Sequence, residues 1–177
     1  MRLPGSLIIF LTTLLLAAGC HTNPGPVKPE STRPPVPARP EIKQTESSTY
    51  RIYLIALEDG GKSGSTVGCG DSLVAVDVPA VDVKTALREL LENNDRLYGQ
   101  SGLYNALYQS DLQVNRITRN NDSINADMSG RLVLGGTCDS PRVKAQLEAT
   151  LRQSTDTKIP VTIRVNRDLL DNLLSGK

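Results

Sequence analysis

Proline is concentrated in one segment of this chain, and that segment limits which residues can form a folded domain. Seven of the eleven prolines lie between residues 22 and 48, with almost no apolar residue among them. Such a segment cannot bury enough apolar surface to offset the entropy lost on ordering, and proline favours an extended polyproline II conformation. Residues 20–48 are therefore predicted to be a disordered, semi-stiff linker, and residues 49–177 a globular domain. A proline-rich ligand for another protein is the alternative interpretation of the segment.

The first 19 residues have the pattern of an export signal. Arg2 is followed by an apolar or neutral run from Leu7 to Leu16 and then by small residues up to Gly19. Ten residues at about 1.5 Å each cover only about half of a bilayer core of roughly 30 Å. The run therefore predicts a signal peptide that is removed, and not a permanent transmembrane helix.

Cys20 directly follows these small residues, and residues 16–20 (LAAGC) resemble the lipobox of bacterial lipoproteins. The lipobox usually has leucine three residues before the cysteine, where this chain has Ala17. The resemblance implies cleavage before Cys20 and lipid on its thiol, which would anchor the mature chain to a bacterial membrane on its extracytoplasmic side. His21 follows the cysteine, so the outer face of the cell membrane and the outer membrane both remain open. An ordinary signal peptide with a coincidental cysteine is the alternative.

Charge and aromatic content restrict the partners and the core of the domain. The chain has 20 lysines and arginines against 19 acidic residues, so removing residues 1–19 with Arg2 leaves 19 of each. A formally neutral chain implies no basic face for phosphate-dominated binding, and no nucleic-acid partner is predicted. There is no tryptophan, and the single phenylalanine, Phe10, lies in the signal peptide, so the core is predicted to be aliphatic. Tyr104 and Tyr108 are interpreted as packing residues with solvated hydroxyls.

Cys69 and Cys138 are the two cysteines that remain after lipidation of Cys20. An even pair in an oxidising compartment predicts a disulfide. Bonded cysteines have Cα atoms about 5.5 Å apart, so a disulfide would bring Asp71 and Asp139 within about 10 Å of each other.

The predicted acid pair, Asp71 and Asp139, has three interpretations. It could bind a calcium ion or another ligand, or it could act in acid/base chemistry. The preferred interpretation is structural, with Asp71 binding loop amides and Asp139 assisting a helix cap at Ser140.

Hydrophobic periodicity predicts an α+β domain with a mostly antiparallel sheet and two main helices on one face. Helices are predicted after N-caps at Asp82 and Ser140, and Asn120-Asn121 predicts a two-residue hairpin turn. The segment 97–110 is expected to be a loop with a short helix, and residues 168–174 a helical turn or an extended tail. Strands are predicted over residues 50–57, 72–78 (ended by Pro79), 112–119, 123–128, 131–134 and 159–165.

Four short segments stand in a defined order along the domain: residues 54–59 (LIALED), 67–74 (VGCGDSLV), 101–107 (SGLYNAL) and 134–143 (LGGTCDSPRV). Together they resemble the GerMN domain of the GerM sporulation and spore germination family, and the resemblance covers roughly residues 50–166. It implies an α/β domain similar to the ring-building domains of secretion machines. It also implies a membrane-tethered role in envelope assembly or sporulation through protein contacts, with no established catalytic residues.

Catalysis is not expected from these residues. The only histidine, His21, lies outside the domain, which leaves no Ser/His, Cys/His or His-ligated metal site. Residues 56–63 end like a phosphate-binding loop, but Ala56 replaces its first glycine, and the next predicted element is a strand and not the helix whose N-terminus would bind phosphate. No catalytic residue, metal or cofactor is predicted. The predicted function is a non-catalytic module that binds envelope proteins; a small-ligand or glycan-binding module and a carboxylate-based wall hydrolase are the alternatives.

Overall fold

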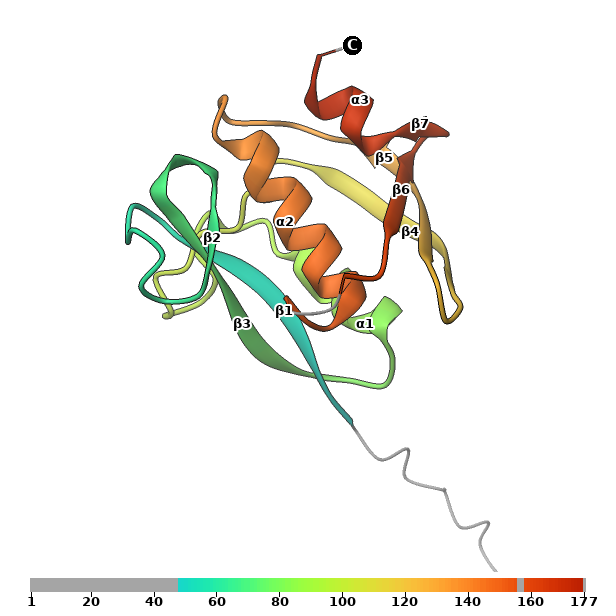
Figure 1. The fold of residues 1–177 in the computed structure, drawn as a ribbon, viewed down its shortest axis with the longest axis horizontal. Helices are drawn as coiled ribbons and strands as arrows, with labels where there is room; N and C mark the ends of the chain where they lie inside the picture. Colours follow the sequence, from blue (N-terminus) through green and yellow to red (C-terminus); the bar gives the residue numbers. More distant parts are fainter. Residues whose placement is uncertain (1–47, 156–157, 177) are drawn as a thin grey trace, which may run out of the picture. The chain divides into compact units, whose positions relative to one another are not determined.

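The structure, a computed structural model, describes residues 48–155 and 158–176 (Figure 1). The predicted signal peptide, the lipidation of Cys20 and nearly all of the predicted linker lie outside these residues. Within them, no helix is long and apolar enough to cross a membrane.

The described strands form two sheets where a single sheet was predicted. The first sheet contains β1 (Ser48–Ala56), β2 (Ser65–Val67) and β3 (Asp71–Ala80) in the antiparallel order β1-β3-β2. The second sheet contains β4 (Asp111–Arg119), β5 (Ile124–Arg131), β6 (Val161–Val165) and β7 (Asp168–Leu169) in that order. Its β5–β6 pair is parallel and its other two pairs are antiparallel. The α+β class and the mostly antiparallel pairing are therefore confirmed.

Two main helices connect the sheets. The helix α1 (Val83–Glu92) contacts β1 and β3 of the first sheet and β4 of the second, and α2 (Asp139–Arg152) contacts β1 and β6 (Figure 1). A short helix, α3 (Leu170–Leu174), follows β7, so the tail is extended first and helical afterwards. Both main helices contact both sheets. The helices and the two sheets therefore share a single hydrophobic core.

The core of the described residues is mainly aliphatic, as predicted, but it also contains the buried rings of Tyr53 and Tyr104. Each element contributes the apolar side chains that its periodicity places on one face. The largest fully buried apolar side chains are Ile52, Leu54, Ile55, Leu87, Leu90, Leu107, Ile124, Val143, Leu147, Leu151 and Val165.

The predicted start of α1 is confirmed and that of α2 is wrong by two residues. Asp82 caps α1 by accepting a hydrogen bond from the Thr85 amide at 2.7 Å, which lowers the pKa of the Asp82 carboxyl. In α2 the N-cap position is occupied by Cys138, and the helix begins at Asp139. The Ser140 hydroxyl instead donates to the carbonyl of Leu174 at 3.1 Å, so it fastens α3 to α2.

Several loop predictions are also wrong, each for a local reason. Pro79 lies inside β3 and is paired with Thr49 of β1. On its other side β3 is paired with β2 only from Asp71 to Leu73. The missing N–H of Pro79 therefore costs no hydrogen bond between strands. The hairpin after β4 is a four-residue loop, residues 120–123. The Asn120 side chain accepts from the amides of Asp122 and Ser123 at 3.0 and 2.7 Å, and neither asparagine of the pair has a positive φ.

Two predicted elements do not form. Residues 132–134 lie beyond the end of β5 and belong to no strand. The segment 97–110 contains turns and isolated bridges in place of a short helix, and its Tyr104 exchanges backbone hydrogen bonds with Ile55 at 2.7 and 3.0 Å. This segment therefore extends the first sheet for one residue beside β1.

Side chains of α2 and of its C-cap residue, Gln153, close the rest of that edge of β1. The Gln153 side chain accepts from the Arg51 amide and donates to the Arg51 carbonyl, both at 2.8 Å. Thr150 accepts from the Tyr53 amide at 3.1 Å, and Gln146 donates to the Tyr53 carbonyl at 2.9 Å. The backbone groups of β1 on this side thus have protein partners from Arg51 to Ile55.

Candidate functional site

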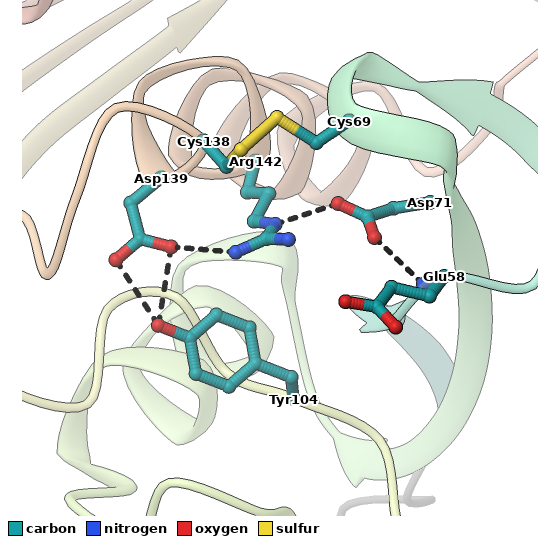
Figure 2. Close-up of a disulfide and its surroundings, with 7 residues drawn as sticks. All are labelled: Glu58, Cys69, Asp71, Tyr104, Cys138, Asp139 and Arg142. Carbon is teal, nitrogen blue, oxygen red and sulfur yellow. Dashed lines mark hydrogen bonds and ion pairs between the residues drawn. A yellow bond between two sulfur atoms is a disulfide. The ribbon is translucent and has the colours of Figure 1, made fainter.

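The disulfide between Cys69 and Cys138 defines the candidate site (Figure 2). Cys69 lies in the 3-10 helix η1 (Gly68–Gly70), directly before β3, and Cys138 directly precedes α2. The two Cα atoms are 5.9 Å apart, as the predicted pairing requires. The chain turns sharply at Cys69 to enter β3, and Cys69 has a φ of 67°. A positive φ is uncommon for a residue other than glycine.

Arg142 binds both carboxylates of the predicted acid pair (Figure 2). Its Nε donates to Asp71 Oδ2 at 2.7 Å, and its Nη1 donates to Asp139 Oδ1 at 3.2 Å. Asp139 and Arg142 are three residues apart on α2, so they project from the same side of the helix. The disulfide holds the start of β3 against this turn of α2 and thereby brings Asp71 to the same guanidinium.

The remaining oxygen of each carboxylate accepts from backbone amides or a hydroxyl. Asp71 Oδ1 accepts from the Glu58 amide at 2.9 Å, and Asp139 Oδ2 accepts from the Gly135 amide at 2.8 Å. The Tyr104 hydroxyl donates to Asp139 at 3.1 Å. Asp71 is fully buried, and Asp139 is 2% exposed. Asp71 therefore binds a loop amide as the structural interpretation predicts, whereas Asp139 binds the glycine loop and not the Ser140 cap.

Two acidic and two basic side chains give the site a formal charge of zero. Asp71 and Asp139 supply two negative charges, Arg142 supplies one positive charge, and the guanidinium of Arg96 lies 5.7 Å from the centre of the Tyr104 ring. Arg142 lies 5.5 Å from the same ring centre, so two cations flank one aromatic ring. The cluster is formally neutral when Arg96 is included.

Burial and hydrogen bonds shift two pKa values in the cluster. Burial raises the pKa of Tyr104 to about 12, and the charge of Asp139 and the hydrogen bond to it act in the same direction. Burial of Arg142 opposes its charged form, but the hydrogen bonds to Asp71 and Asp139 outweigh this and raise the pKa of the guanidinium. At neutral pH the cluster therefore contains a charged arginine and a protonated tyrosine.

A small cavity of about 260 Å³ lies beside the cluster. Ligand pockets of about 300–1,000 Å³ are usual for small molecules, so this cavity is just below that range. Its lining comprises Leu57, Arg96, Tyr104, Tyr108, Gly135, Gly136, Cys138, Asp139 and Arg142.

The arrangement restricts the chemistry open to the acid pair. Calcium takes six to eight oxygen ligands, but the oxygens of Asp71 and Asp139 already accept from Arg142, from backbone amides and from Tyr104. The described part of the chain contains no group of three or more His, Cys, Asp or Glu side chains that could hold a metal ion. A cation site or an acid/base pair at Asp71 and Asp139 would require Arg142 to move away.

A second buried network continues from the cluster into the domain. Asn105, fully buried next to Tyr104, donates to the carbonyls of Leu90 in the last turn of α1 and of its C-cap Asn93, at 3.2 and 2.9 Å. Gln146, one turn after Arg142 on α2, accepts from the Ala106 amide at 2.8 Å. These bonds tie α1, α2 and the segment 97–110 together.

Sequence reasoning did not find Arg142, Tyr104, Asn105 or Gln146 as members of the site. The spacing of Asp139 and Arg142 on one helix was a local signal for an ion pair. The Tyr104 hydroxyl was predicted to be solvated, but it is bonded to Asp139 and its residue is 5% exposed. The partnership of Arg142 with Asp71 spans 71 residues and has no local signal.

Comparisons with protein-family models, with curated proteins and with solved structures found no match for this chain. The resemblance to the GerMN domain therefore remains a prediction from the sequence.

Proposed function

We propose that this chain is a lipid-anchored envelope protein whose single GerMN-like domain binds other envelope proteins and catalyses no reaction. The observation that carries the proposal is that the carboxylates of Asp71 and Asp139 are buried and already bonded to Arg142 and to other protein donors. Catalytic acids and bases need groups that can reach a substrate proton. Here both carboxylates are buried and bonded to protein donors.

The segments that resemble the GerMN domain supply the residues of this cluster. Cys69 and Asp71 come from the second segment, Tyr104 from the third, and the stretch from Cys138 to Arg142 from the fourth. The first segment contributes the Glu58 amide. The pattern thus consists of residues that hold the domain together, which supports its interpretation as the signature of a fold and not of a reaction.

The proposed location rests on the first 48 residues. Two or three acyl chains on Cys20 would hold the chain durably on its membrane. A linker of about 27 residues in polyproline II would reach roughly 80 Å if fully extended. Restriction to this shell raises the effective concentration of the domain toward other envelope proteins, so weak contacts would suffice.

Lipidation can be tested by metabolic labelling with an alkyne fatty acid. We expect label on the wild-type chain and none on Cys20→Ala, with Cys69→Ser as a matched control that keeps the label. Equal labelling of wild type and Cys20→Ala would refute the anchor.

Function by contact can be tested in a deletion strain of the native host. Crosslinking should capture envelope proteins, and an exported form without Cys20 and the linker should complement poorly. The variant Asp71→Asn with Asp139→Asn should complement if its disulfide and its unfolding midpoint show that it is folded. A folded but inactive double variant, together with full complementation by the untethered domain, would show that the acid pair is the site.

The small cavity is the observation that would favour a ligand-binding module. Arg96 lines it and makes no ion pair within 4.0 Å among the described residues, so Arg96→Gln tests this candidate directly. We favour protein contact because the cavity is small and most of its polar side chains already have partners.

A further inference from the structure

The second sheet has one face that none of the described helices covers. Along β5 the side chains of Ile124, Ala126 and Met128 are buried, so alternate residues point to the opposite face. The register of the neighbouring strands extends this assignment across the sheet. We call this surface the outer face; it comprises Asp111, Gln113, Arg116 and Thr118 of β4, Asn125, Asp127, Ser129 and Arg131 of β5, and Thr162 and Arg164 of β6. None of these residues is buried.

The outer face carries an excess of positive charge. With Arg167 of the turn between β6 and β7 it has four arginines, against the two aspartates Asp111 and Asp127, a formal charge of +2. Arg164 and Arg167 make no ion pair within 4.0 Å among the described residues. Two guanidinium groups therefore remain available to an anion from outside the domain.

A cavity of about 600 Å³ opens beside these two arginines. Its size is within the usual range for binding sites. Its lining comprises Asn115, Asp127, Met128, Ser129, Arg164, Asn166 and Arg167.

The turn that carries Arg167 is held in a strained conformation. Asn166 and Arg167 have φ values of 52° and 81°, a left-handed region that favours glycine or asparagine and disfavours arginine. The Asn166 side chain fixes the turn, because it accepts from the Gly130 amide at 3.1 Å and donates to the Gly130 carbonyl at 2.7 Å. Strain that is maintained in this way is found mostly where a side chain has a task.

An apolar side chain lies opposite Arg164 in the sheet. Leu169 of β7 is the register partner of Arg164 and is 41% exposed; it lines a neighbouring cavity beside Thr162, and not the cavity of Arg164 and Arg167. The outer face thus combines two unpaired guanidinium groups with one exposed leucine.

We propose that the outer face binds an acidic segment of a partner protein, with a carboxylate on Arg164 and Arg167 and an apolar side chain on Leu169. This inference rests on the proposed function by protein contact and names the chemistry of the partner. The planar fork of arginine matches carboxylate geometry, and charge-assisted hydrogen bonds of this kind are stronger than neutral ones. No tyrosine belongs to the outer face, so it lacks an aromatic platform on which sugar rings or bases could stack.

Binding can be measured by fluorescence anisotropy with the full-length chain in detergent. The probe is a labelled ten-residue peptide in which Asp and Leu alternate; matched peptides have Asn in place of Asp, or Ser in place of Leu. We expect the Asp-Leu peptide to bind more tightly than both matched peptides and to weaken as salt is raised. Arg164→Gln and Arg167→Gln should each weaken binding about fivefold, which is the upper end for an exposed ion pair.

Arg51→Gln is the matched control, because it removes one exposed arginine from the first sheet. It should leave binding unchanged, and all variants should keep the wild-type unfolding midpoint. Equal binding of the Asn peptide, no response to Arg164→Gln or Arg167→Gln, or binding of polygalacturonate in preference to every peptide would overturn the inference.

Complementation separates this inference from the proposed function. Arg164→Gln combined with Arg167→Gln should complement a deletion strain poorly. If this variant complements fully while the untethered domain fails, contact remains the function and the outer face is not the surface used.

Discussion

The two sheets of this domain are stabilised in different ways. Apart from Ser110, the buried polar residues lie in or against the first sheet: Asp71, Ser72, Asn105, Asp139, Gln146 and Thr150. The disulfide is on the same side. The buried side chains of the second sheet are apolar, such as Ile124 and Met128 of β5 and Ile163 of β6.

The difference shows where single substitutions should be most harmful. Removing one partner of a buried ion pair leaves a charge without compensation, which costs more than the small cavity left by a shortened aliphatic side chain. The first sheet should therefore be sensitive to loss of a partner, and the second sheet only to loss of volume.

The largest effect is expected for Arg142→Gln. This substitution leaves Asp71 and Asp139 buried without their common cation, and we expect a loss of about 3–5 kcal/mol in the free energy of unfolding. Urea unfolding measures the change, with Arg142→Lys as a control that keeps the charge but loses the fork. A loss of less than about 1 kcal/mol for Arg142→Gln would remove the proposed contrast between the sheets.

The double substitution Cys69→Ser with Cys138→Ser should have the next largest effect. The disulfide closes a loop with a sequence separation of 69 residues. Loop-closure entropy for that length corresponds to about 4 kcal/mol, although engineered and native disulfides range from about 0 to 5. Thermal unfolding measures the change. Peptide mapping without reductant should first show the linked pair, and quantitative alkylation of both thiols in the exported wild type would contradict it.

Alkaline pH should destabilise the domain through Tyr104. Its pKa is raised from 10.0 to about 12 in the folded state, so the folded state retains a proton that the unfolded state releases. Its contribution to stability is fully present below pH 10 and is lost as the pH rises toward 12. At pH 11 we expect wild type to lose about 1–2 kcal/mol that Tyr104→Phe does not lose. Urea unfolding at pH 9 and pH 11 tests this, with Tyr50→Phe as the control; equal losses in wild type and Tyr104→Phe would contradict it.

The smallest effect is expected in the second sheet. Ile163→Val removes one methylene group from a residue that is 4% exposed and should cost about 0.5–1.5 kcal/mol. Calorimetry or urea unfolding measures the loss. If this loss equals the loss for Arg142→Gln, the proposed difference in sensitivity between the two sheets is wrong.

Features with local causes could be predicted from the sequence. The helix α1 combines an aspartate cap with an apolar stripe, and both signals lie within residues 82–92. The hairpin of β4 and β5 could be predicted because the two strands are close in sequence. Its loop differs from the predicted two-residue turn, since the Asn120 side chain accepts a hydrogen bond from the Ser123 amide. The pairing of Cys69 with Cys138 could be predicted because they are the two cysteines left once Cys20 is assigned to lipidation, and because an exported chain meets an oxidising compartment.

Features that depend on contacts between distant residues could not be predicted. The strands form two sheets in place of one, and β5 pairs in parallel with β6 although α2 lies between them in the sequence. The site is more than an acid pair because Arg142 reaches Asp71 across 71 residues, and Tyr104 reaches Asp139 across 35. Periodicity describes one element at a time and contains no information on such partners.

The edge of β1 that has protein partners from Arg51 to Ile55 affects how neighbouring molecules can associate when they are close together. An open strand edge can template the addition of strands from a neighbouring molecule and so start a fibril. Here β1 is sealed by Gln146, Thr150, Gln153 and the Tyr104 backbone, β2 and β7 have only three and two residues, and β4 is interrupted by a bulge at Asn115. Copies held close together by the proposed lipid anchor would therefore have few open strand edges through which to extend one another's sheets.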